Sequence, residues 1–210
     1  MCKIIDKFMK LQYRELPELN DDMLIADYCK SKSVIRRLHL LKNILLEAGI
    51  SHVKSHEICK KLLLECLIPA GTKSNVRGGK FNHIIAKELA LNLKKLKMKD
   101  YALCVEKKHA MFPEIPDWII QKGRKTLVGF NQISLFGGGH QLNRGYKYIM
   151  DDKMHADHKR LNVKMVCIVK EIPINKGGKS HSILMKGIKT QRIFCVGGLN
   201  KLIKDYFNVA

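Results

Sequence analysis

One carboxylate and two adjacent amides form the part of the sequence best suited to chemistry. Asp117 lies in a predicted strand over 115–120, and a polar run with a central glycine predicts a hairpin turn into a second strand over 126–136. Asn131 and Gln132 lie at the middle of that second strand. An acid beside polar groups on an antiparallel neighbour can hold Mg²⁺, which takes oxygen ligands and keeps waters and a phosphate oxygen. Because successive strand residues point to opposite faces, only one of the two amides can face such a site.

The residues after the second strand could bind phosphate. Three glycines at 137–139 permit a sharp turn, and helical spacing resumes over 140–150. Cations and amides at the opening of a helix attract phosphate, and the helix N-terminus adds backbone donors. The candidates for DNA contact here are His140, Gln141, Asn143 and Arg144. Lys147 lies further along the same helix.

A second candidate surface for DNA precedes the next predicted helix. The segment 70–80 contains three glycines among polar and basic residues, which predicts a loop whose backbone N–H groups and cations could approach a phosphate. Its candidate contacts are Lys73, Asn75, Arg77 and Lys80. An ordinary connecting loop explains the same composition. The helix predicted over 81–97 has one acid, Glu88, which spacing alone interprets as a surface residue.

These motifs resemble those of a nuclease superfamily. The tripeptide PDW at 116–118 and the run GFNQISLFGGGHQLNRGYKYI at 129–149 are similar to segments of the PD-(D/E)xK nucleases, in particular the small type II restriction endonucleases of restriction systems. The resemblance covers roughly 76–208. The second half of the motif departs from the family pattern, because Asn131 and Gln132 stand where an acid, any residue and lysine are usual.

The resemblance implies a fold, a metal and roles for residues. It implies a restriction-endonuclease-like mixed β-sheet flanked by helices, Mg²⁺ bound by Asp117 and Glu88, and Asp117, Asn131, Gln132 and Lys147 as the catalytic set. Lys125, at the hairpin, is an alternative to Lys147 as the source of the motif's positive charge. A palindromic target implies a homodimer with two-fold symmetry.

Composition favours a polyanionic partner. The 210 residues include 39 Lys and Arg against 19 Asp and Glu, a formal net charge of +20. Nucleic acid fits this charge best, because Lys and Arg release counterions from phosphates, and a membrane surface is the competing polyanion. The resemblance makes the expected partner double-stranded DNA. No apolar run approaches 18 residues and no signal-peptide core is present, so we expect a cytoplasmic (intracellular) protein without a membrane span.

The seven cysteines form no CxxC pair, and we expect reduced thiols.

The pattern of elements predicts an α/β fold with an N-terminal helical region. Residues 1–70 read as helices, and 71–210 as an α/β core that forms one compact unit with them. Further strands are predicted over 101–106, 163–169 and 191–196, with a final helix over 199–207 and a flexible basic loop over 172–190. The helix between the strands ending at 136 and starting at 163 is a crossover, which makes part of the sheet parallel.

The expected function is Mg²⁺-dependent, sequence-specific cleavage of double-stranded DNA. The alternative is a catalytically inactive DNA- or RNA-binding protein on the same fold, which the missing acid and lysine favour. A third class, a structural protein associated with RNA, explains the charge but not the acid–hairpin–amide pattern. For Asp117 itself the plain alternative is an acid that only accepts hydrogen bonds from backbone N–H groups.

Overall fold

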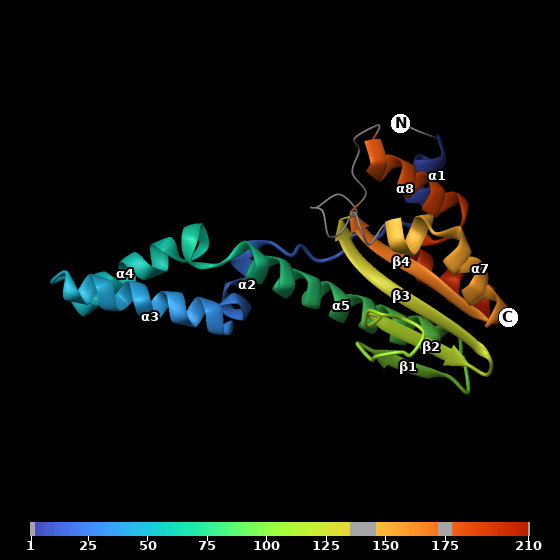
Figure 1. Ribbon diagram of the computed structural model, residues 1–210, viewed down its shortest axis with the longest axis horizontal. Coiled ribbons are helices and arrows are strands. Elements are labelled where there is room, and N and C mark those ends of the chain that lie inside the picture. Colours follow the sequence, from blue (N-terminus) through green and yellow to red (C-terminus); the bar gives the residue numbers. More distant parts are fainter. Residues whose placement is uncertain (1–2, 135–145, 172–177, 210) are drawn as a thin grey trace. The chain divides into compact units, whose positions relative to one another are not determined.

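The computed structural model describes residues 3–134, 146–171 and 178–209 (Figure 1). The chain divides into a helical unit, residues 17–80, and an αβ unit, residues 1–16 and 81–210. The elements in chain order are α1 (Lys3–Gln12), α2 (Asp21–Tyr28), α3 (Lys32–Glu47), α4 (His52–Leu62), η1 (Leu63–Leu67), α5 (Ala70–Lys95), β1 (Ala102–Val105), β2 (Trp118–Lys122), β3 (Lys125–Ser134), η2 (Tyr146–Met150), α7 (Asp152–Arg160), β4 (Val163–Glu171), α8 (Gly178–Lys189), β5 (Ile193–Cys195), η3 (Val196–Gly198) and α9 (Leu199–Phe207). The division places α1 with the αβ unit, and the boundary at residue 80 falls inside α5.

A five-stranded mixed sheet, in the order β1-β2-β3-β4-β5, forms the centre of the αβ unit. The first three strands are antiparallel, whereas β4 and β5 run parallel to β3. Lys122 pairs with Lys125 across a two-residue turn, in which Gly123 adopts a φ of 56° that favours glycine. The predicted hairpin, the crossover between β3 and β4 and the α/β class are therefore confirmed.

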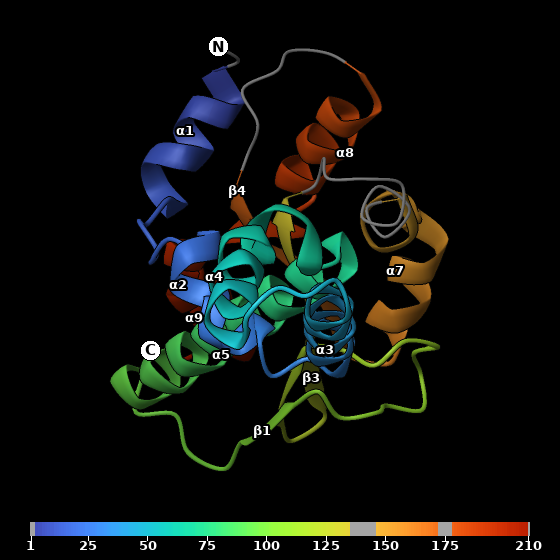
Figure 2. The ribbon, with the colours of Figure 1, turned by 90° about the vertical axis from the view of Figure 1, so that its left-hand side faces the viewer.

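Both faces of the sheet are buried in its central strands, β3 and β4, whereas the edge strand β1 has no fully buried residue. Val128, Phe130 and the β4 residues Met165 and Cys167 belong to one cluster, which also contains Ile183 of α8. The intervening residues Trp118, Leu127 and Ile168, which are also buried, point to the other face. In Figure 2, α7 and α8 lie on one side of the sheet, with α5 and α9 on the other. Strands covered on both faces contain continuous apolar runs, as β4 does over residues 165–169.

The helical unit corrects one sequence-based prediction. Residues 70–80, predicted to be a glycine-rich loop, form the first turns of α5. Each glycine in a helix interior costs about 1 kcal/mol relative to alanine. Contacts within the unit offset this cost, because the Asp21 carboxylate accepts from Lys73 Nζ at 3.0 Å and from Arg77 Nη2 at 2.6 Å. Lys80 Nζ lies 2.8 Å from the Asp27 carboxylate. The backbone N–H groups expected to cradle a phosphate are part of a helix.

The segment near the C-terminus corrects another prediction. Residues 178–189, part of the predicted flexible basic loop, form helix α8. The reason is packing, since Ile183 and Leu184 are almost fully buried in the core cluster. The predicted glycine hinge at 137–139 and the opening of the helix after it lie outside the described residues. Among the described residues, no helix is long and apolar enough to cross a membrane.

Candidate active site

Asp117 lies immediately before β2, where the backbone is still paired on both sides. Its N–H donates to the carbonyl of Gly129 on β3 at 3.0 Å, and its carbonyl accepts from the N–H of Glu106, just after β1, at 3.1 Å. The Asp117 side chain accepts from the Asn131 N–H at 2.5 Å. Strand pairing therefore fixes this carboxylate between the ends of two neighbouring strands.

A second carboxylate lies beside Asp117. The side-chain amide of Asn82, on α5, donates both to Asp117 Oδ1 at 2.9 Å and to Glu106 Oε1 at 3.1 Å. Two acceptors of one amide nitrogen are at most about 6 Å apart at these lengths. We call Asp117 and Glu106 the carboxylate pair. Antiparallel registry explains this pair: Val105, the last residue of β1, pairs with Trp118, so Glu106 after it falls opposite Asp117 before β2.

Asn131 belongs to the same network, and Trp118 fixes its side chain. Trp118 Nε1 donates to Asn131 Oδ1 at 3.0 Å, and Asn131 Nδ2 donates to Asn82 Oδ1 at 3.0 Å. The tryptophan ring lies against Gly129, where an added Cβ would be 1.9 Å from a ring carbon. Glycine at this position allows the ring to cross β3 and reach Asn131.

The donor set around the carboxylate pair fits Mg²⁺. Magnesium is usually held by one or two carboxylates and keeps several waters and phosphate oxygens as its other ligands. Asp117 and Glu106 supply those two carboxylates, and Glu106 is exposed to solvent. Among the described residues, no group of three or more His, Cys, Asp or Glu that could hold a metal ion occurs. Mg²⁺ at this pair would need water and phosphate oxygens as its other ligands.

Gln132 faces the other side of the sheet from this network. It is 3% exposed, and neither its amide oxygen nor its amide nitrogen has a hydrogen-bond partner in the described part of the chain. The two amides therefore lie on opposite faces, as expected from the alternation, and Asn131 is on the side of Asp117. Its backbone N–H contacts Asp117, whereas its side-chain amide contacts Asn82 and Trp118. Gln132 does not join the contacts of the carboxylate pair.

Glu88 and Lys147 have other partners. The carboxylate of Glu88, six residues beyond Asn82 on α5, accepts from Arg14 Nη1 at 2.7 Å. Lys147 Nζ pairs with the Glu114 carboxylate at 3.0 Å and lies 5.2 Å from the centroid of the Tyr148 ring. The metal role expected of Glu88 and the catalytic role expected of Lys147 remain predictions.

The predicted DNA-contacting residues fall into two groups. Lys73, Arg77 and Lys80 are paired with acids inside the helical unit, while Asn75 is exposed on α5. The four residues expected at the opening of the later helix lie outside the described residues, and they are His140, Gln141, Asn143 and Arg144. The described cations closest in sequence to the carboxylate pair are Lys107 and Lys108, which are exposed and follow Glu106 directly.

Asn82 and Glu106 were missed by the sequence analysis. Glu106 ends a predicted strand, and only the registry of that strand against β2 reveals that it lies beside Asp117. Asn82 has no local signal, because its role depends on how α5 packs against the sheet. Gly129 is the one signal that was present, since a glycine inside an apolar strand often marks a close approach. No family model, curated protein or solved structure matches the chain.

Proposed function

We propose that this protein is a Mg²⁺-dependent endonuclease that hydrolyses phosphodiester bonds in double-stranded DNA, with the sequence specificity of the type II restriction enzymes. The observation that carries the proposal is the carboxylate pair, Asp117 and Glu106, held by a single amide at the ends of two strands. Glu106 provides the second acid that the sequence lacks on β3. The formal net charge of +20 supports a polyanionic substrate.

The order of elements also supports a nuclease of the resembled type. A helix, three antiparallel strands, a helical crossover and a strand parallel to the third follow one another along the αβ unit. This order brings Asp117 and Asn131, from the two parts of the PD-(D/E)xK resemblance, to one end of the β2–β3 hairpin. A fold alone does not establish an activity, so the proposal depends on the site.

The side chains around the pair have distinct tasks in the proposed reaction. Asp117 and Glu106 would hold a Mg²⁺ ion, which when bound would polarise the scissile phosphate and lower the pKa of a bound water. Asn82 keeps both carboxylates in place by donating to each, and the Asn131 N–H orients Asp117. Neither amide can take a proton from water, so the acceptor is a carboxylate oxygen or solvent. Lys107 and Lys108 attract the phosphates on either side.

One observation favours a second candidate, a nucleic-acid-binding protein without catalytic activity. Both oxygens of Asp117 already accept a hydrogen bond, one from Asn82 and one from the Asn131 backbone. In the second candidate, the only role of Asp117 is to order the start of β2 through these hydrogen bonds, as Asp side chains do at turns. The two candidates differ in whether removing the charge of Asp117 removes an activity or only stability.

Cleavage of long, mixed-sequence DNA in the presence of Mg²⁺ tests the proposal. Wild-type protein should produce discrete fragments, and Asp117→Asn and Glu106→Gln should each abolish them while duplex binding persists, because an amide attracts Mg²⁺ much less than a carboxylate does. Asp157→Asn, an exposed acid on α7, is the matched control. Glu88→Gln tests the acid that the sequence led us to expect at the metal. Cleavage should persist in this variant if Glu106, and not Glu88, is the second carboxylate of the site. Absence of fragments, or fragments produced at the wild-type rate by folded Asp117→Asn, would rule the proposed active site out.

A further inference from the structure

A pocket lies at the end of the sheet remote from the carboxylate pair. It has a volume of about 550 Å³ and opens where β3 and β4 begin, beside Lys125 and Val163. Asn131 is six residues further along β3, which corresponds to about 20 Å at 3.3 Å per residue. The pocket and the carboxylate pair are therefore separate sites of the αβ unit.

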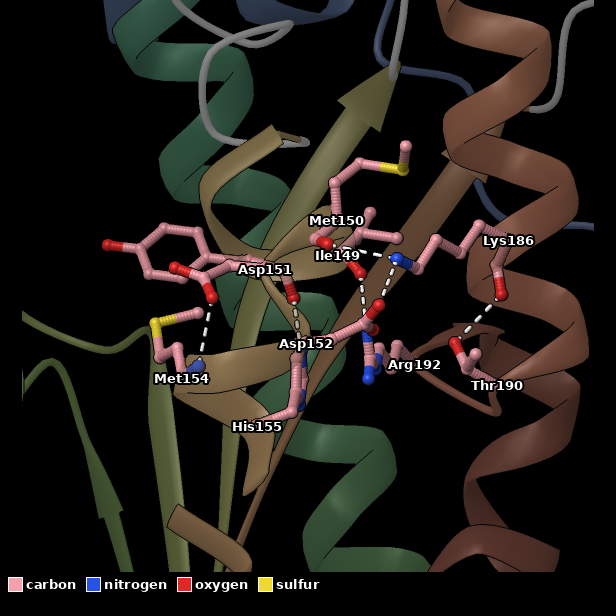
Figure 3. A network of polar contacts seen from close by, with 10 residues as sticks. Ile149, Met150, Asp151, Asp152, Met154, His155, Lys186, Thr190 and Arg192 are labelled. Carbon is pink, nitrogen blue, oxygen red and sulfur yellow. Dashed lines mark hydrogen bonds and ion pairs between the residues drawn. The ribbon is translucent and has the colours of Figure 1, made fainter. Parts of the chain in front are cut away.

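The described lining of this pocket contains four cations and no carboxylate. The cations are Lys125, Lys159, Lys164 and Arg192. Arg192 is held by its neighbours, because its Nη1 donates to Asp152 Oδ1 at 2.7 Å and to the Ile149 carbonyl at 2.6 Å. Figure 3 shows Asp152 between Arg192 and Lys186, whose Nζ lies 2.6 Å from the other carboxylate oxygen. The charge of Arg192 is thus already matched by an acid.

His155, which also lines the pocket, is neutral at pH 7. Its Nε2 lies 2.8 Å from the carbonyl oxygen of Tyr148, and burial lowers the pKa of the ring to about 4. The hydrogen bond to a carbonyl assigns the proton to Nε2. His155 therefore lines the pocket as a neutral ring held by its hydrogen bond, and the unmatched positive charge of the pocket comes from the lysines.

The three lysines have no ion-pair partner among the described residues. Lys125 Nζ donates to the Tyr206 carbonyl at 2.9 Å, which leaves its charge unmatched. Lys164 lies over the Phe194 ring at 5.7 Å, and burial lowers its pKa while Asp205 opposes that shift. Lys159 is exposed in the last turn of α7. Three like charges around one concavity repel each other, and a bound anion relieves that repulsion.

We propose that this pocket, which we call the lysine pocket, binds a backbone phosphate of a nucleic acid several nucleotides away from the cleaved bond. The inference rests on the proposed function in one respect, that nucleic acid is the partner. Lysines act as point-charge donors to phosphate oxygens, and the exposed amide of Gln191 adds a donor to the same wall. The separation of about 20 Å matches about six base pairs of duplex at 3.4 Å each. A single duplex can therefore reach both sites.

Binding of a 30-base-pair duplex without Mg²⁺ tests the lysine pocket. The double variant Lys159→Gln/Lys164→Gln removes two charges from the pocket. The control variant Lys153→Gln/Lys201→Gln removes two exposed charges outside the pocket, one from α7, which also contains Lys159, and one from α9. The slope of log K against log salt is negative, and the loss of one phosphate contact should reduce its magnitude by about 0.9. The same loss should weaken binding about tenfold near 100 mM salt. The control should change affinity by no more than about twofold. Lys159→Gln alone, at an exposed position, should show part of the effect without disturbing packing.

Equal salt slopes and affinities for the pocket variant and its control would overturn the inference. A second arm uses inorganic phosphate and follows the melting temperature. If the pocket variant loses stabilisation by inorganic phosphate while its affinity for duplex stays at the control value, the pocket serves a small phosphate compound and the polynucleotide assignment is wrong. Cleavage is scored in a separate reaction, so failure of the pocket and failure of the proposed active site are distinguishable.

Discussion

The two units of the molecule use their charges differently. The helical unit contains 11 Lys and Arg against seven Asp and Glu, whereas the αβ unit contains 28 against 12. In the helical unit, two acids, Asp21 and Asp27, pair with four of the cations. In the αβ unit, three lysines of the lysine pocket, Lys125, Lys159 and Lys164, and the two lysines after Glu106 have no acid as an ion-pair partner among the described residues. Most of the +20 excess therefore belongs to the αβ unit, which is the unit that the proposed nucleic-acid binding requires to be basic.

The comparison shows why a count of basic residues locates a binding surface poorly. Lys73, Arg77 and Lys80 have the composition of a phosphate-binding loop, but they hold a helix in place. The lysine pocket is assembled from residues that are scattered between 125 and 206 in the sequence. What decides the role of a cation is whether an acid already lies beside it.

The largest expected difference between the units concerns their glycines. Gly129→Ala should destabilise the αβ unit by about 3 kcal/mol, because the new Cβ overlaps Trp118 and overpacking displaces rings or backbone. Gly79→Ala, in the helical unit, meets open space inside a helix and should stabilise by about 0.5–1 kcal/mol. Thermal unfolding followed by circular dichroism measures both. A Gly129→Ala protein as stable as the wild type would mean that the tryptophan does not lie across β3.

The next effect tests the structural role of the cations in the helical unit. Asp21→Asn removes the partner of Lys73 and Arg77, and a hydrogen-bonding partner of the Tyr28 hydroxyl, so we expect a loss of about 1–2 kcal/mol at these partly exposed positions. Asp22→Asn, an exposed neighbour, is the control. Duplex affinity should stay within about twofold. If releasing Lys73 and Arg77 strengthened duplex binding tenfold without lowering stability, these residues would be phosphate ligands, as the sequence suggests.

Acid should weaken the αβ unit at a higher pH than the helical unit. Burial lowers the pKa of His155 from 6.5 to about 4, so that only the unfolded state gains a proton as the pH falls from 6.5 to 4. The contribution of His155 to the stability of the αβ unit is therefore fully present above pH 6.5 and is lost as the pH falls towards 4. The loss amounts to about 1–2 kcal/mol when solvent screening of the ring is included. The pKa of Asp21 is lowered, chiefly by the Tyr28 hydroxyl, so its contribution is lost only below pH 3.8.

Urea unfolding at pH 7 and pH 4.5, followed by fluorescence of the only tryptophan, Trp118, reports on the αβ unit. His155→Gln should reduce the difference in stability between the two pH values. His83→Gln, with an exposed ring on α5, should leave that difference unchanged. The same pH dependence in the wild type and in His155→Gln would show that another group controls it.

Local pattern was enough to predict most of the αβ unit. The hairpin, the parallel crossover and α9 follow from apolar runs and turn residues, which are properties of neighbouring positions. Residues 70–80, and residues 178–189 of the loop predicted over 172–190, are helical because of distant partners. Asp21 stabilises the first through residues about 50 positions away, and the core cluster buries Ile183 in the second. Glycine content and charge do not reveal such partners.

Only part of the candidate site could be predicted from the sequence, because the rest of it depends on contacts between distant parts of the chain. Asp117 and Asn131 stand out because both belong to one hairpin, whose pairing can be inferred from sequence. Glu106 requires the registry of β1 against β2, and Asn82 requires the packing of α5 on the sheet. Glu88 was the expected acid because it is the only one in that helix, but the structure pairs it with Arg14.

Cation binding by the carboxylate pair is the most direct test of the account. Titration with Mn²⁺, a paramagnetic stand-in for Mg²⁺, followed by electron paramagnetic resonance needs neither DNA nor cleavage. The wild type and the control Asp157→Asn should bind one Mn²⁺ with equal Kd, and Asp117→Asn and Glu106→Gln should each raise that Kd at least about tenfold, because each loses one of two charged ligands. Wild-type protein that binds no Mn²⁺, or both variants binding it with the wild-type Kd, would contradict the account.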